Sequence, residues 1–190
     1  VRRQRQMCIR DSARSVGANT VTWNRCHEPW RVAQDAELAT VLGERGHTVR
    51  TCNGSLLWEP RDVLKKDGTP YRVFTPFFRR GCLNAPPPRT PIPAPALQLI
   101  DVPGGRTIAD LRLLPDVPWH TSLEPHWEPG EAGARLRLSR FLEEGLAGYR
   151  DGRDYPSRES VSRLSPHLHF GELSPNRAWY ASIAVSYTHL

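Results

Sequence analysis

The sequence has no apolar run approaching the roughly 18–20 residues that span a bilayer, and no apolar segment near its start. We therefore predict neither a membrane-spanning helix nor a secretory signal. Its four cysteines, Cys8, Cys26, Cys52 and Cys82, include no C-x-x-C pair, which excludes the usual structural zinc site and redox dithiol. Such thiols are typical of a reducing compartment, and we expect a cytoplasmic protein.

Lysine is nearly absent, because only Lys65 and Lys66 stand against 24 arginines. The net charge is +6, and residues 1–12 supply half of it. The rest of the chain is therefore only mildly basic and lacks the concentrated charge that marks a nucleic-acid-binding face. We attribute the arginine excess to a GC-rich genome rather than to function.

The two ends differ in character from the rest. Residues 1–12 show neither a helical nor a strand period, and residues 184–190 follow a helical pattern with no stop signal. We interpret both as non-native tails around a gene fragment whose informative part is about 13–183. The alternative is a disordered basic tail and a frayed helix.

A strand–helix–strand pattern opens the informative part. Val21 to Trp23 form a β-prone run, apolar residues recur at helical spacing after Pro29, and Gly46 suits the end of that helix. Residues 47–53 read as a second strand. This βαβ unit predicts a parallel sheet whose other strands lie elsewhere, and we assign residues 13–83 to a partial α/β domain.

An aromatic and basic segment, residues 71–80, lies later in this domain. It resembles a stacking surface for nucleic acid, but we favour a short amphipathic element packed under the domain. Seven prolines then fall within residues 84–105, where they prevent regular structure. We predict an interdomain linker over 84–130.

Helical periodicity returns at residue 131. Apolar residues from Leu138 to Tyr149 form one stripe, Arg140 and Glu144 are an i,i+4 pair, and a further helix begins at Ser174 and Pro175. We predict an all-α region over 131–183. The fold class is therefore α/β followed by all-α.

One loop gathers anion-binding residue types before this last helix. Ser162, Arg163 and Ser165 place hydroxyls and a guanidinium on one turn with free backbone N–H groups, and Tyr149 could cover the same ligand. Short Ser/Arg loops are more often only caps and solvated charge, so the residue types leave both interpretations open.

His167, His169 and Glu172 suggest a metal site, but no fourth ligand is evident. We therefore predict hydrogen-bonded structural histidines and no metal. No nucleophile elbow accompanies any serine, so hydrolysis is not indicated.

Five strings, in order, resemble the DNA photolyase/cryptochrome family: WNRCHEPWRVAQD, NGSLLWEP, DGTPYRVFTPFFRRGCL, WEPGEAGA and RDYPSRESVSRLSPHLHFGELSP. The similarity is closest to bacterial members that repair cyclobutane pyrimidine dimers, the deoxyribodipyrimidine photo-lyases. It implies the C-terminal half of a Rossmann-like antenna domain, a long Pro-rich linker and the first helices of a helical FAD-binding domain.

The resemblance also implies site residues. Tyr149 matches a tyrosine that contacts FAD, and Arg153 matches an arginine placed against the DNA backbone. The loop that receives the FAD phosphates is matched by Val161, Ser162, Arg163, Leu164 and Ser165. Val161 stands where many members have threonine. No catalytic residue is assigned, because the residues around the flavin ring and the lesion lie outside this chain.

For function, the resemblance implies a monomeric enzyme that acts on UV-damaged DNA by light-driven electron transfer from reduced FAD, with this fragment alone inactive. The alternatives are a cryptochrome-type photoreceptor without repair, or a non-enzymatic nucleotide-binding module. Trp30 and Arg31 stand where folate-binding members carry an Asn-Glu pair, which leaves the antenna open between methenyltetrahydrofolate and a deazaflavin.

Overall fold

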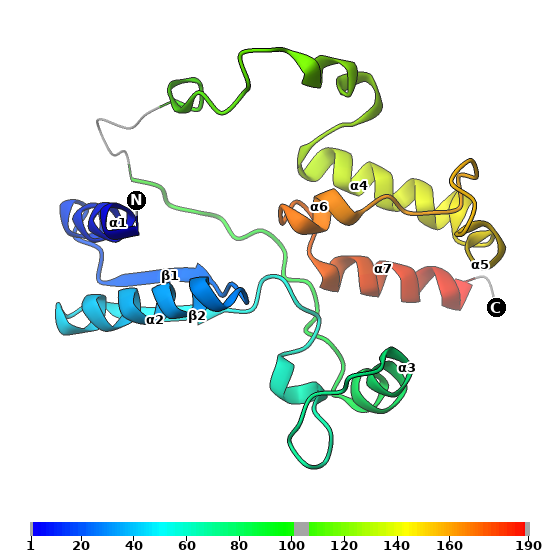
Figure 1. The fold of residues 1–190 in the computed structure, drawn as a ribbon, viewed down its shortest axis with the longest axis horizontal. Helices are drawn as coiled ribbons and strands as arrows, with labels where there is room; N and C mark the ends of the chain where they lie inside the picture. Colours follow the sequence, from blue (N-terminus) through cyan, green and yellow to red (C-terminus); the bar gives the residue numbers. More distant parts are fainter. Residues whose placement is uncertain (1, 101–106, 189–190) are drawn as a thin grey trace. The chain divides into compact units, whose positions relative to one another are not determined.

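Two units make up the computed structural model, which describes residues 2–100 and 107–188 (Figure 1). One unit is Val1–Gly54 with Ala96–Arg106, and the other is Ser55–Pro95 with Thr107–Leu190. Residues 55–83 thus group with the later helices rather than with the βαβ unit. The assignment of these segments to domains of a complete protein stays a prediction.

The predicted βαβ unit is confirmed. Strand β1 (Thr20–Asn24), helix α2 (Pro29–Glu44) and strand β2 (Thr48–Cys52) follow one another, and the two strands pair in parallel. Their register runs from Thr20 opposite Thr48 to Asn24 opposite Cys52. Gly46 ends α2 at φ +86°, a left-handed conformation that costs glycine little, and the chain returns at once to β2.

The expectation of no regular structure in residues 1–12 is wrong. Helix α1 (Arg2–Ser15) covers them. Ile9 and Ala13 are four residues apart and thus share a helix face. Ala13 is buried, and Ile9 lies beside Leu38 of α2. One apolar pair separated by arginines is too weak a period to find from sequence. Whether these residues are native stays a prediction.

The second unit is mostly helical. Its 3-10 helices are η1 (Pro60–Val63), η3 (Cys82–Asn84), η4 (Ala109–Leu111), η5 (Trp119–Ser122) and η6 (Glu124–His126). Its α-helices are α3 (Phe74–Pro76), α4 (Gly130–Arg140), α5 (Tyr149–Gly152), α6 (Ser165–His169) and α7 (Pro175–Thr188), and π turns form η2 (Phe77–Gly81) and η7 (Phe141–Gly145). An α/β part followed by helices confirms the predicted fold class.

A small apolar core joins α4, α6 and α7. Ala134, Leu138, Leu164 and Leu173 are buried in it, and Leu142, Ala178 and Ala181 pack around them. Gly133 of α4 is buried because the backbone of Glu128 crosses it, and an added Cβ would overlap the Glu128 carbonyl oxygen. The segment before α4 is thereby held directly against that helix.

The helix predicted to run to Tyr149 is shorter. It widens into the π turn η7 and ends at Gly145, and α5 starts separately at Tyr149. At its end the Glu159 carbonyl oxygen comes within 3.0 Å of where a Cβ on Gly145 would lie, so the chain packs closely against this glycine. The predicted Arg140–Glu144 pair is confirmed at 3.1 Å.

The first part of the Pro-rich segment is held by side chains rather than free. Residues 86–100 contain no helix or strand, as predicted. The Trp58 indole donates to the Pro86 carbonyl (2.8 Å), the Tyr180 hydroxyl to that of Pro88 (2.5 Å) and the Asn176 amide to that of Arg89 (2.7 Å). These bonds tie residues 86–89 to Trp58 and to α7.

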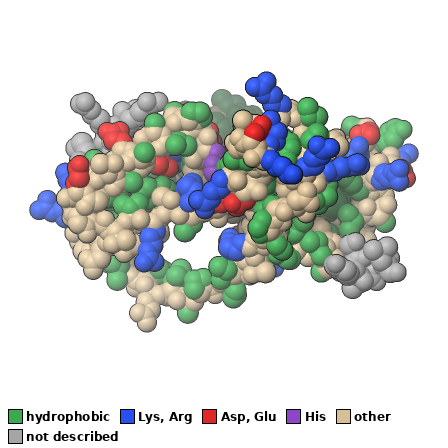
Figure 2. Space-filling model, turned by 90° about the horizontal axis from the view of Figure 1, so that it is seen from below, with side chains coloured by type: hydrophobic (Ala, Val, Ile, Leu, Met, Phe, Trp, Pro, Cys, Tyr) green, Lys and Arg blue, Asp and Glu red, His purple; other side chains and the backbone are tan. Residues whose placement is uncertain are grey.

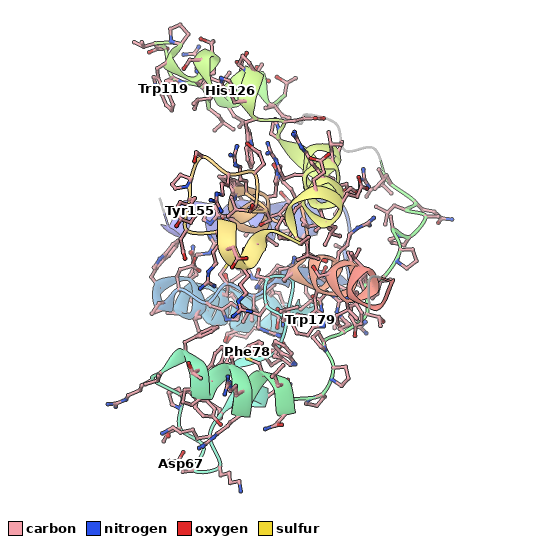
Figure 3. All side chains as sticks on the ribbon, turned by 90° about the vertical axis from the view of Figure 1, so that its right-hand side faces the viewer. Asp67, Phe78, Trp119, His126, Tyr155 and Trp179 are labelled. Carbon is pink, nitrogen blue, oxygen red and sulfur yellow. The ribbon has the colours of Figure 1, made fainter. Side chains whose placement is uncertain are left out.

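An open cavity of about 690 Å³ lies between residues 55–82 and α7. Phe78 and Trp179 line it from facing segments (Figure 3), and Trp58 packs edge-on against Trp179 with ring centroids 5.5 Å apart. The aromatic segment 71–80 is therefore a short helical element that borders an apolar cavity, close to the favoured prediction.

Large hydrophobic side chains are widely exposed. Phe74, Leu99 and Ile108 are 72%, 84% and 81% exposed, and Figure 2 shows hydrophobic side chains spread among the arginines of one face. Within the described residues, no helix has the length and apolar character needed to cross a membrane.

Candidate functional site

Tyr149 and the predicted anion loop meet beside η7. The Tyr149 ring packs edge-on against Phe141, with centroids 6.0 Å apart, and Phe141 also borders Val161 and Ser162. Gly152 of α5 is buried because the Ser160 side chain occupies the space where a Cβ would lie. The structure therefore brings Tyr149 to the start of the loop, as the sequence predicts.

Backbone donors are exposed along this loop. Within the part of the chain that the structure describes, the N–H groups of Val161, Ser162, Arg163 and Leu164 donate to no acceptor. The Ser162 and Ser165 hydroxyls are likewise unpaired there. A run of free N–H groups beside free hydroxyls suits an anion with several oxygen atoms.

Arg163 gives this loop an unusual backbone conformation. Arg163 has φ +52°, a left-handed conformation uncommon for a residue with a Cβ. The next residue, Leu164, is buried in the core and is 6% exposed. Helix α6 then begins at Ser165. The Arg163 guanidinium donates to the Glu159 carboxylate at 3.0 Å, so its charge is already partly neutralised.

Two arginines of α4 border the loop. Arg137 and Arg140 line a hollow of about 10 Å³ with Val161 and Ser162. Arg140 is paired with Glu144, whereas Arg137 has no carboxylate partner among the described residues. So small a hollow encloses no cofactor, and the described residues offer one wall of a binding site. No local sequence signal identifies Arg137, because its position depends on a long-range contact.

Arg153 lies at the end of α5 with its side chain 57% exposed. Its guanidinium is 3.8 Å from the Asp154 carboxylate. An exposed pair at this distance is weak, so the arginine is available to a phosphate group.

The prediction of a hydrogen-bonded structural histidine is wrong for His169, which is exposed and whose ring makes no hydrogen bond within the described chain. His167 is hydrogen-bonded, as predicted: it is 1% exposed, and its Nδ1 donates to the Glu172 carboxylate at 2.6 Å. Its ring stacks on Trp127 at 4.4 Å between centroids. Glu172 also accepts a hydrogen bond from the Gly130 backbone N–H. Among the described residues, no three His, Cys, Asp or Glu side chains group to hold a metal ion.

A second hollow, of about 250 Å³, lies between β1 and α2 in the first unit. Trp23 and Arg31 line it, and the indole Nε1 and guanidinium Nε are buried without an acceptor in the described chain. Trp30 is half exposed, and the Arg31 guanidinium lies 5.4 Å from its ring centroid.

Comparison with known proteins finds relatives among photo-lyases and cryptochromes. A family model described as DNA photolyase matches residues 1–96, including residues 1–12. A deoxyribodipyrimidine photo-lyase of Agrobacterium fabrum is 40% identical over 94% of this chain, and cryptochrome-1 of Arabidopsis thaliana is 31% identical over 90%. These matches cover 38% and 25% of the respective relatives, so the chain spans well under half of their length.

A solved structure extends the similarity to the fold. The class III photolyase of Agrobacterium tumefaciens superposes with a TM-score of 0.89 at 39% identity, over 96% of this chain and 38% of that one.

Acid should remove the contribution of Glu172 to stability. The hydrogen bond from His167, followed by that from Gly130, holds the pKa of the Glu172 carboxyl below its ordinary value of 4.5. A carboxyl with a lowered folded pKa stabilises the fold above its unfolded pKa and loses this effect as the pH falls through the folded pKa. We therefore expect wild type to exceed Glu172→Gln in unfolding midpoint at pH 7, and the difference to shrink below pH 4.5.

Urea unfolding of both proteins between pH 7 and pH 3 measures this difference. The carboxyl pKa values of Asp67 and Asp110 are also lowered by hydrogen bonds from threonines. Both residues are present in both proteins, so their effects on the pH dependence cancel in the difference between the two unfolding midpoints. An equal difference at pH 7 and pH 3 would contradict the expected linkage.

Proposed function

The chain belongs to the DNA photolyase family, and we propose that it forms part of a longer light-driven DNA repair flavoprotein, with the loop Val161–Ser165 holding the FAD diphosphate. The observation that carries the proposal is the run of four unpaired backbone N–H groups from Val161 to Leu164. A diphosphate offers enough oxygen atoms to accept from all four.

The neighbouring residues fit the same ligand. The Ser162 and Ser165 hydroxyls can each donate one further bond, and Arg137 supplies a positive charge without a carboxylate partner. Tyr149, whose ring is 42% exposed beside Phe141, offers an aromatic surface at the edge of the loop. When bound, reduced FAD supplies the light-excited electron that splits the cyclobutane ring, while the protein orients donor and lesion.

We assign Arg153 to a phosphate of the damaged DNA strand. An exposed guanidinium with only a weak neighbouring ion pair can bind a phosphate, and such a contact positions the strand without reading sequence. Flipping a damaged dinucleotide out of the duplex costs less than flipping an intact one, because its stacking is already disturbed.

An antenna chromophore has a candidate site in the first unit. Trp23 and Arg31 line the hollow between β1 and α2, where they would border a bound heterocycle. Folate and deazaflavin both contain a heterocycle, so this lining does not decide between them. The cytoplasmic location and the monomeric state stay predictions.

Cryptochrome-type photoreception is the second candidate function, since the relatives include both photo-lyases and cryptochromes. Higher identity to the photo-lyase, 40% against 31%, favours repair. Both classes would use the same loop for FAD, so a repair assay is needed to separate them.

The backbone rather than the guanidinium of Arg163 should bind FAD. Arg163→Gly keeps the N–H and adopts φ +52° without strain, so we expect FAD affinity within about threefold of wild type. Arg163→Pro removes the N–H and fixes φ near −65°, so we expect affinity to fall by at least about a hundredfold. Fluorescence titration of the complete protein with FAD measures both, and circular dichroism checks that each variant is folded. Equal loss of FAD in the two folded variants would contradict a backbone site.

Repair activity decides between the two candidate functions. We expect the complete protein, loaded with reduced FAD, to restore a thymine-dimer oligonucleotide under blue light and not in the dark. Chromatographic analysis of the oligonucleotide follows the reaction. FAD binding without repair would instead support the photoreceptor, and this chain alone, residues 1–190, should show no repair.

A further inference from the structure

Glu172 and His167 lie outside the loop, yet their contacts connect it to the start of α4. The Glu172 carboxylate accepts from the His167 ring and from the Gly130 N–H, and the Glu172 N–H donates back to the His167 carbonyl at 2.9 Å. His167 is the third residue of α6, and α6 begins where the loop ends. The pair therefore fixes the direction in which the chain leaves the loop.

A second set of contacts reaches the loop from the other side. Trp127 stacks on His167, and the Arg137 guanidinium lies 5.7 Å from the centroid of the Trp127 ring. Arg137 in turn borders Ser162. The buried histidine is thus connected to both ends of the loop, through α6 on one side and through Trp127 and Arg137 on the other.

We propose that Glu172 and His167 are positioning residues that hold the loop Val161–Ser165 in the conformation that binds the FAD diphosphate. The inference rests on the proposed function for its ligand and on the hydrogen bonds above for its mechanism. A loop with φ +52° at Arg163 needs support from its surroundings, because an arginine does not favour that conformation on its own. The Glu172 carboxylate supplies this support through its hydrogen bond with His167.

Three variants of the complete protein test the proposal. Glu172→Ala removes both bonds to the carboxylate, and Glu172→Gln keeps an acceptor oxygen for His167 if the alanine variant does not fold. Asp67→Ala is the matched control, since Asp67 also accepts two bonds, from the Thr69 N–H (2.9 Å) and hydroxyl (2.7 Å), but lies in a remote turn of the same unit (Figure 3).

The first measurement is the FAD dissociation constant at a temperature where every variant is fully folded. We expect Glu172→Ala to weaken FAD binding by roughly tenfold or more, Glu172→Gln by less, and Asp67→Ala by less than about twofold. A purely structural role would lower the unfolding midpoint of Glu172→Ala while leaving the dissociation constant within twofold of wild type, and that result would overturn the proposal.

The second measurement separates this proposal from the proposed function. Trypsin cleavage after Arg163, followed by mass spectrometry in the absence of FAD, reports loosening of the loop itself. We expect cleavage several-fold faster in the Glu172 variants than in wild type and Asp67→Ala. Faster cleavage in a protein that takes up no FAD would support the positioning role while contradicting the FAD assignment. Unchanged cleavage would overturn the positioning role.

Discussion

The left-handed backbone of Arg163 is the constraint on which the candidate site depends. It directly precedes Leu164, which is buried in the core with residues of α4. Around Arg163, four consecutive N–H groups, from Val161 to Leu164, donate to no acceptor in the described chain. A backbone N–H group that is buried without an acceptor raises the free energy of the folded protein. A ligand that accepts hydrogen bonds from such groups removes this cost, which favours its binding. The proposed anion site therefore rests on these backbone donors.

Much of the first unit was predictable because its signals are local. The β-prone run before Asn24, the helical spacing after Pro29 and the glycine at position 46 each depend on neighbours in sequence, and β1, α2 and β2 follow. Helix α1 was missed because its apolar face consists of few residues among arginines. The apolar period from Leu138 to Tyr149 predicted one continuous helix, and it does not encode the π turn η7 or the packing of Glu159 against Gly145.

The residue types of the candidate site could be predicted from the sequence, but the residues that pack against the site could not. Ser162 and Ser165 stand out by type, and the structure places them on one loop beside Tyr149. Arg137 and Trp127 carry no such signal. Arg137 belongs to a polar helix face, whose residue types indicate exposure to water, and Trp127 belongs to a segment predicted to be linker. In the structure Trp127 stacks on His167, and Arg137 lies over the Trp127 ring and borders Ser162. The Arg163 guanidinium, by contrast, is engaged by Glu159, so the proposed anion site uses the Arg163 backbone N–H instead.

A crystal structure of the complete protein with FAD tests the central claim most directly. The account predicts diphosphate oxygens within hydrogen-bond distance, about 2.7–3.2 Å, of the backbone nitrogens between Val161 and Leu164. Phosphates bound elsewhere, with these four N–H groups facing water or other protein atoms, would contradict it.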